Sequence, residues 1–170
     1  MNPYTDLKPR SYRPRLFDTL IERYLKIFGA LEICGTRWCG KSWSAMAFSQ
    51  SITRVDEDVA LYNDDPSLAL IGEQPHAIDE WQDAEAIWNR VRHRIDDSNN
   101  EPGQFILTGS STPRAREGRH SGAGRIAHLR MRTMTLSELG LSTGKVSLAG
   151  LFENKFEPQK SHLGLEQYAS

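Results

Sequence analysis

Segment 35–42, with the sequence GTRWCGKS, holds the residues best suited to chemistry. It matches the phosphate-loop pattern G-x-x-x-x-G-K-[ST] at every fixed position. Glycines at positions 35 and 40 allow backbone angles that other residues avoid, so consecutive N–H groups can point at phosphate oxygens. Lys41 can reach the β- and γ-phosphates of a nucleotide, and Ser42 can place its hydroxyl on Mg²⁺. The pattern predicts a nucleotide-binding loop made of Gly35, Thr36, Arg37, Trp38, Cys39, Gly40, Lys41 and Ser42.

The residues around this loop fit the same interpretation. An apolar run over 28–34 is typical of a buried strand, and 42–48 is compatible with a helix. The helix would add N-terminal N–H donors and the positive end of its dipole to the loop. The alternative, a glycine turn followed by a surface lysine and a capping serine, is disfavoured by this strand–loop–helix context.

Two adjacent carboxylates, Asp79 and Glu80, follow the apolar pair Ala77-Ile78. Magnesium chemistry at a phosphate loop needs such groups: Asp79 would hold Mg²⁺ through water, and Glu80 would act as general base on the attacking water. The alternative is an exposed acidic pair that caps a helix beginning near Trp81. Beside an intact phosphate loop, the metal and base roles are favoured.

A second apolar run, 105–107, ends in hydroxyl residues. If this strand lies between the first and third strands, Thr108 or Ser110 reaches the γ-phosphate region, where it would orient water or sense hydrolysis. A serine-rich turn is the alternative.

Arginines 114, 116, 119 and 125 follow, and one of these guanidinium groups can neutralise a γ-phosphate, often from a neighbouring subunit. The glycine-rich segment 119–125 is expected to be a nucleotide-responsive loop.

The elements that must position these groups alternate along the chain. Strands alternating with helices indicate parallel strands joined by crossover helices, hence an α/β fold with about five mostly parallel strands flanked by helices in three layers. Residues 63–66 are expected to form a turn, because Asn, Asp and Pro favour turns. The predicted helices are 14–26, one from about Lys41 and one over 84–95; the predicted strands are 28–34, 59–62, 77–78, 105–107 and 126–131.

Composition bounds the class of protein. The 170 residues, 38% hydrophobic and 25% charged, suit one folded domain, and the net charge of −1 excludes a polyanion binder that relies on overall charge. We expect no membrane span and no secretion signal, because the apolar runs are short. We expect a reducing cytoplasm, because there are only two cysteines.

Charge is divided unevenly along the chain. Residues 56–101 hold thirteen acidic residues and three arginines, whereas 114–132 hold six arginines and one glutamate. One interpretation is that both charged segments are solvated faces of one domain. The other is that residues 114–132 form a basic block that contacts a nucleotide or nucleic acid.

The motifs GTRWCGKS, AIDEWQ, FILTGSS and HSGAGRIAHLRMRTMTLSELG together resemble a family of prokaryotic AAA-type P-loop ATPases over about residues 12–152. The resemblance implies that Lys41 and Ser42 occupy the Walker A positions and Asp79 and Glu80 the Walker B pair. It further implies that Ser110, or Thr108, is the sensor, and that Arg125 is a characteristic arginine that contacts the γ-phosphate. The catalytic set is then Lys41, Glu80, Ser110 and Arg125, with Ser42 and Asp79 at the metal.

The resemblance also sets expectations for domain organisation. Family members commonly have proline where Thr36 stands, and they continue into a C-terminal domain of unknown function. We therefore expect an N-terminal arm over 1–13, an AAA-type ATPase domain over 14–152, and a tail over 153–170 that leads toward a domain absent here.

The expected function is Mg²⁺-dependent ATP binding with ATP hydrolysis, slow unless a second copy or another partner supplies an arginine in trans. A nucleotide-gated module that binds nucleic acid or protein and hydrolyses little is the alternative. A small-molecule kinase and an inactive fragment of a longer protein are further alternatives.

Overall fold

The computed structural model describes residues 7–110, 122–142 and 145–155 of the chain. It divides into two compact units, Met1–Thr133 and Met134–Ser170. The second unit contains the short helix α5 (Leu148–Phe152), whose N-terminus is capped by Ser147, since its Oγ accepts from the N–H of Gly150 at 3.0 Å. Among the described residues, none of the helices is both long and apolar enough to cross a membrane.

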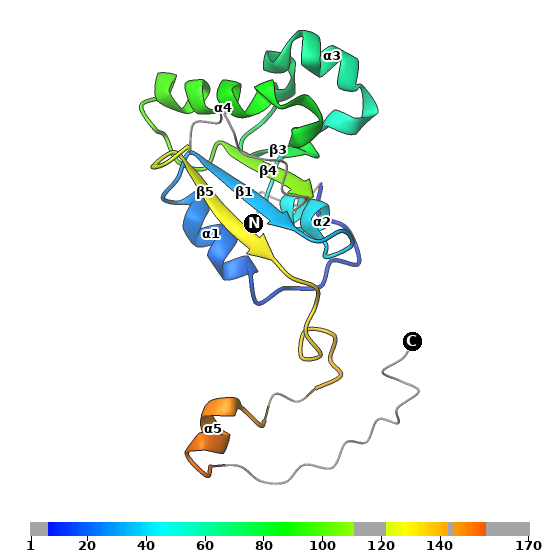
Figure 1. Ribbon diagram of the computed structural model, residues 1–170, viewed down its shortest axis with the longest axis vertical. Helices are drawn as coiled ribbons and strands as arrows, with labels where there is room; N and C mark the ends of the chain where they lie inside the picture. Colours follow the sequence, from blue (N-terminus) through cyan, green and yellow to red (C-terminus); the bar gives the residue numbers. More distant parts are fainter. Residues whose placement is uncertain (1–6, 111–121, 143–144, 156–170) are drawn as a thin grey trace. The chain divides into compact units, whose positions relative to one another are not determined.

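The first unit is built on a five-stranded parallel sheet with the strand order β2-β3-β4-β1-β5 (Figure 1). This arrangement confirms the predicted α/β fold. Strands β1 and β4, in the middle of the sheet, are almost entirely buried, as expected for parallel strands covered on both faces. The strands are β1 (Ala30–Gly35), β2 (Ser51–Arg54), β3 (His76–Asp79), β4 (Phe105–Ser110) and β5 (Ile126–Met131).

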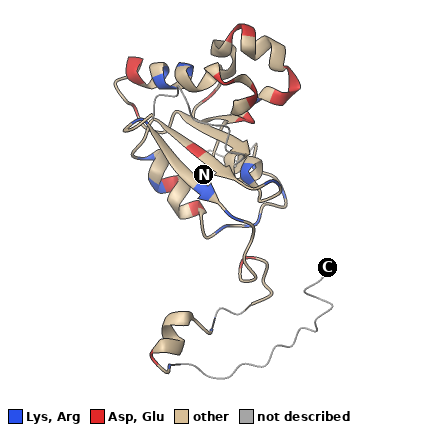
Figure 2. Ribbon diagram, in the orientation of Figure 1, with Lys and Arg blue, Asp and Glu red and all other residues tan. Residues whose placement is uncertain are grey.

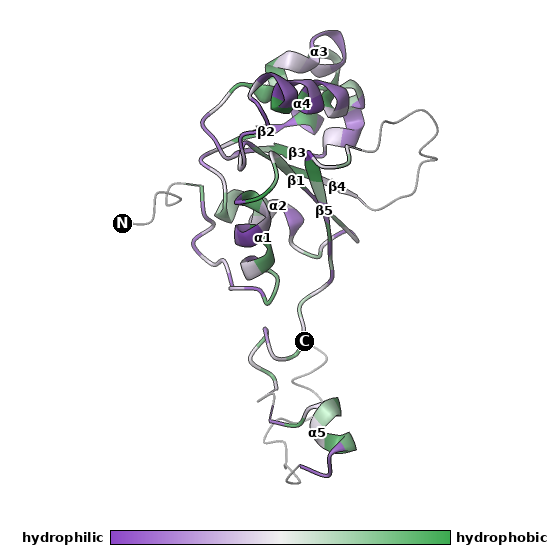
Figure 3. Cartoon of the chain, turned by 90° about the vertical axis from the view of Figure 1, so that its left-hand side faces the viewer, coloured by the Kyte–Doolittle hydropathy of each residue, from purple (hydrophilic) through white to green (hydrophobic). Residues whose placement is uncertain are grey.

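Side chains that alternate along the strands feed two separate hydrophobic clusters, one on each face of the sheet. Leu31, Ile33 and Ile106 pack with residues of helices α1 (Asp18–Leu25) and α2 (Lys41–Ala47). Phe105 and Leu107 point to the opposite face, where helix α4 (Ala86–Asp97) contributes an apolar stripe. The result is three layers, helix–sheet–helix, with the apolar strands between the helices (Figure 3).

The register places the carboxyl ends of the strands at one edge of the sheet. Gly35 pairs with Ser110 on one side and with Met131 on the other, so the phosphate loop leaves the sheet beside the ends of β4 and β5. Strand β4 lies between β1 and β3, as the prediction for its hydroxyl residues required. Asp79, the last residue of β3, therefore lies one strand beyond β4 at the same edge.

The predicted strand over 59–62 is wrong. Residues Val59–Asp64 form helix α3, because the side chain of Asp58 caps it by accepting from the N–H of Leu61 at 3.1 Å. The second strand along the chain is β2, whose sequence SITR has a single apolar residue and is only partly buried, so it has no strong apolar signal.

Other predicted bounds differ from those of the structure, most clearly at the start of α1 and at the predicted turn. Helix α1 begins at Asp18 rather than at Pro14. The Asp18 carboxylate accepts the backbone N–H of Arg15 at 2.9 Å, so the residues just before Asp18 form a turn that leads into the helix. The predicted turn over 63–66 is divided between the end of α3 and a 3₁₀ helix, Pro66–Leu70, which is capped by Asp65.

Charge is distributed unevenly over the first unit. Acidic residues are frequent on α3 and the segments next to it (Figure 2). Three residues of the predicted basic block, Arg114, Arg116 and Arg119, lie outside the described residues.

Candidate functional site

The two glycines of the phosphate loop are both required by its geometry. A Cβ at Gly35 would collide with the backbone carbonyl oxygen of Met131, since the loop leaves β1 directly against the end of β5. Gly40 has a φ of 96°, a left-handed conformation that side chains rarely adopt, and it directly precedes α2. Trp38 adopts a positive φ of 67° without being glycine, and its side chain is 99% exposed at the tip of the loop.

Lys41 is folded inward over this loop. The residue is only 6% exposed, and its Nζ donates to the carbonyl oxygen of Thr36 at 3.1 Å. A buried ammonium group carries a desolvation cost unless acceptors surround it. The single loop carbonyl can be replaced or joined by phosphate oxygens, so the position suits an anion held within the loop.

The hydroxyl of Ser42 and the carboxylate of Asp79 meet at the end of the sheet. Ser42 Oγ donates to Asp79 Oδ1 at 2.9 Å, although the two residues are 37 positions apart. Asp79 is 8% exposed, and Thr108, fully buried, donates its hydroxyl to the same carboxylate oxygen. The donor set fits Mg²⁺, which prefers oxygen ligands and is commonly held by one or two protein groups plus phosphates and water.

Glu80 is held beside this pair by its backbone and its side chain. Its φ of 53° turns the chain sharply after β3, so adjacent carboxylates do not follow the usual alternation of a strand. Its N–H donates to Thr108 Oγ1 at 3.4 Å, and its Oε2 accepts from Gln82 Nε2 at 2.5 Å. The two carboxylate residues predicted as the Walker B pair, Asp79 and Glu80, thus lie near the carboxyl end of β4.

The two candidate sensor residues occupy different positions on β4. Thr108 lies inside the sheet and bonds to Asp79, whereas Ser110 is half-buried at the end of the strand, opposite Gly35 in the register. Thr108 is therefore tied to the carboxylate side of the site, and Ser110 to the start of the phosphate loop.

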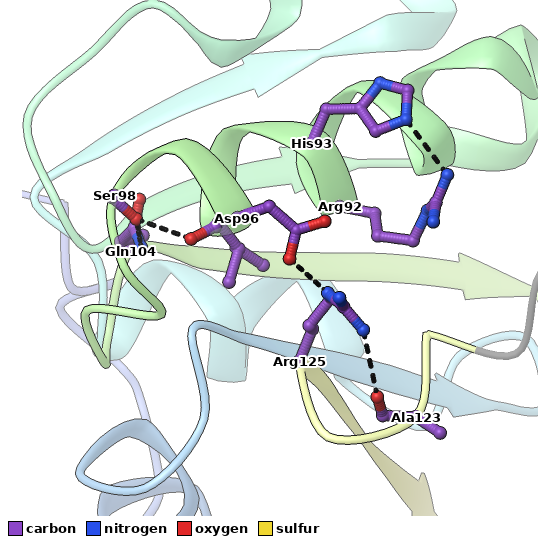
Figure 4. A network of polar contacts seen from close by, with 8 residues as sticks. Arg92, His93, Asp96, Ser98, Gln104, Ala123 and Arg125 are labelled. Atoms are coloured by element: carbon purple, nitrogen blue, oxygen red, sulfur yellow. Dashed lines mark hydrogen bonds and ion pairs between the residues drawn. The ribbon is translucent and has the colours of Figure 1, made fainter.

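Arg125 lies at the other end of the sheet. It precedes β5, and its neighbour Ile126 pairs with Ala30, at the opposite end of β1 from Gly35. Five residues of strand separate the two ends, roughly 16 Å. The guanidinium forms an ion pair with Asp96 of α4 and donates to the carbonyl of Ala123 (Figure 4). The structure does not bring Arg125 together with the predicted catalytic residues.

Two residues contact the site without having been assigned a role by sequence reasoning. Gln82 bonds to Glu80 and lies against Gly109, where a Cβ would be 2.6 Å from Gln82 Oε1. Arg15 donates from Nη1 to the carbonyl oxygen of Cys39 at 2.9 Å. Gln82 belongs to the AIDEWQ motif, which was the available signal; Arg15 is remote in sequence and gave none.

A family model described as an AAA domain matches residues 28–140, more than half of the chain. The chain belongs to the AAA domain family. Membership carries a nucleotide-binding, ATPase-like function, and it agrees with a parallel sheet that carries a phosphate loop after β1. No curated protein matches the chain. The matched part of the AAA domain contains every predicted site residue but not Arg15.

Proposed function

We propose that this AAA domain binds ATP together with Mg²⁺ at the loop 35–42 and Asp79, and hydrolyses it. The observation that carries the proposal is the hydrogen bond between Ser42 and Asp79, next to the buried ammonium of Lys41. A phosphate-loop hydroxyl and a strand-end carboxylate that converge in this way can bind one hard cation from two sides.

Each group has a separate role in this proposal. Backbone N–H groups of the loop and the Nζ of Lys41 bind the phosphates, and Lys41 exchanges its bond to Thr36 for phosphate oxygens. Ser42 and Asp79 hold Mg²⁺, which when bound neutralises charge on the β- and γ-phosphates. The side chain of Trp38 has no role in this proposal, because it is exposed to solvent.

For hydrolysis we propose that Glu80 accepts a proton from water that attacks the γ-phosphate. Gln82 and Thr108 support this role, since they fix the side chain and the backbone of Glu80, respectively. Ser110, at the end of β4 beside the loop, orients the water or contacts the γ-phosphate. In-line attack then requires water between Glu80 and the terminal phosphate.

An arginine that neutralises the γ-phosphate would come from outside the described site. Arg125 is at the far end of its own sheet, so for this residue the role would require the nucleotide of a neighbouring copy. We therefore propose that hydrolysis is slow in an isolated chain and faster when copies associate or when another partner supplies a guanidinium.

The test compares four proteins in nucleotide binding and phosphate release with ATP and Mg²⁺. Lys41→Ala should abolish binding, and Glu80→Gln should retain binding but lose phosphate release. Lys26→Ala is the matched control, because Lys26 is an exposed lysine at the end of α1. Equal phosphate release by wild type and Lys41→Ala, or a phosphorylated acceptor in place of free phosphate, would overturn the proposed hydrolase.

A further inference from the structure

The segment that precedes α1 is bonded to the phosphate loop from outside. Arg15 Nη1 donates to the carbonyl oxygen of Cys39, and Nη2 donates to the carbonyl oxygen of Arg132, both at 2.9 Å. Nη1 also lies 3.4 Å from the position that a Cβ on Gly40 would take. One guanidinium thus connects the second half of the loop to the chain just beyond β5.

The Cys39 carbonyl shares its peptide unit with the N–H of Gly40. In a trans peptide the oxygen and the hydrogen point in opposite directions, so a carbonyl held by Arg15 fixes the Gly40 N–H to point away from Arg15. A cationic donor on the oxygen also polarises the peptide and makes its N–H a stronger donor. Both effects act on an N–H group of the loop that would bind phosphate.

Arg15 is itself held in place by its neighbours. The Asp18 carboxylate accepts the backbone N–H of Arg15 at 2.9 Å and the hydroxyl of Tyr12 at 2.6 Å. The Tyr12 oxygen is 3.3 Å from Oγ of Ser44, which is fully buried in α2. Burial and the neighbouring Asp18 carboxylate raise the pKa of Tyr12, so the phenol stays protonated and can donate throughout the neutral range.

We infer that Arg15 is a positioning residue for nucleotide binding: it orients the Cys39–Gly40 peptide so that the Gly40 N–H is available to a phosphate. The inference rests on the proposed function, because it concerns the same loop. It adds a residue that lies before the matched family segment and that bonds to the loop through the backbone carbonyl of Cys39.

The test measures ADP binding by the full chain, in the presence of Mg²⁺, for the wild type and three variants. Arg15→Met should weaken binding about three- to thirtyfold, because the peptide is no longer oriented or polarised. The ADP affinity of Arg15→Lys should lie between those of the wild type and Arg15→Met, since one ammonium has no planar fork to hold two carbonyls at once. Arg13→Met is the matched control; Arg13 is an exposed arginine two residues away, and its replacement should leave binding unchanged.

Rescue of ADP binding by a small guanidinium compound distinguishes the proposed role from a merely structural one. Millimolar guanidinium chloride should restore ADP binding to Arg15→Met while leaving wild type and Arg13→Met unaffected. Wild-type affinity in Arg15→Met would overturn the inference, as would weakened binding that follows the loss of folded protein and does not respond to guanidinium.

Lys41→Ala in the same titration separates this inference from the proposed function. If the wild type binds ADP, Lys41→Ala does not, and Arg15→Met binds normally, the nucleotide site stands and the role of Arg15 falls. If the wild type does not bind ADP, both fall.

Discussion

Thr108→Val tests the coupling between β4 and the carboxylate of the site. Thr108 is fully buried and donates its hydroxyl to Asp79, so the substitution removes one hydrogen bond while it nearly preserves the side-chain shape. It also removes the oxygen that accepts the N–H of Glu80 at 3.4 Å. Both carboxylate residues proposed for catalysis therefore lose a contact through a single atom.

The magnitude follows from the kind of bond that is lost. A hydrogen bond to a charged group contributes about 1.5–3 kcal/mol. We expect about 2 kcal/mol for Thr108→Val, because Ser42 continues to donate to the same oxygen of Asp79. This corresponds to roughly a thirtyfold change in the folding equilibrium and to a Tm lower by about 4–8 °C.

The assay is urea unfolding of wild type, Thr108→Val, Asp79→Asn and the double variant. If the hydroxyl acts through Asp79, the double variant should be more stable than the sum of the two single effects predicts, by about 1 kcal/mol or more. Thr19→Val is the matched control, since Thr19 is exposed in α1. A change below about 0.5 kcal/mol for Thr108→Val, or strict additivity with Asp79→Asn, would refute the reasoning.

Three further predictions concern the loop, a buried histidine and the basic block. Gly35→Ala should lose about 1–3 kcal/mol of unfolding free energy and weaken ADP binding, measured by urea titration and calorimetry, because its Cβ meets the Met131 carbonyl; unchanged binding would contradict this. His76 has a pKa below its ordinary value of 6.5, chiefly because the ring is buried, although the carbonyl of Ala69 opposes the shift. Below about pH 6.5 the unfolded chain therefore binds a proton at this histidine that the folded chain does not. The unfolding free energy should fall as the pH is lowered from about 6.5 toward the lowered pKa of His76, and it should stay level above about pH 6.5. The urea midpoint should decrease between pH 7.5 and pH 5.5, and this decrease should be smaller in His76→Gln than in the wild type. The control variant His93→Gln, at an exposed histidine, should show the same decrease as the wild type. If the basic block contacts nucleic acid, DNA binding should weaken with salt and weaken again when Arg114, Arg116 and Arg119 become Ala; equal binding by the triple variant would exclude that contact.

Sequence reasoning succeeded where local pattern and structure coincide. The segment from β1 through the loop to α2 is contiguous, its glycines reflect backbone geometry, and its strand is mostly apolar and buried. The same holds for β4, whose apolar residues face both layers. Neither element depends on a distant residue for its type, so composition and spacing were sufficient.

The failures arose where a local signal was weak or had two meanings. Residues 59–62, VALY, have the β-branched and aromatic character of a strand, but the Asp58 cap selects a helix. The true second strand, β2, has three polar residues among four and lies at the edge of the sheet, where β3 is its one partner among the described strands, so its type comes from the sheet rather than from its own residues.

The sequence by itself determined the chemical inventory: a phosphate loop, two adjacent carboxylates, a hydroxyl-rich strand end and several arginines. Only the tertiary structure decided which of these groups meet. Because all five strands run parallel, residues that follow a strand gather at one edge and residues that precede one lie at the other. That rule joins Ser42 to Asp79 and separates both from Arg125, while a turn before the first helix places Arg15 against the loop.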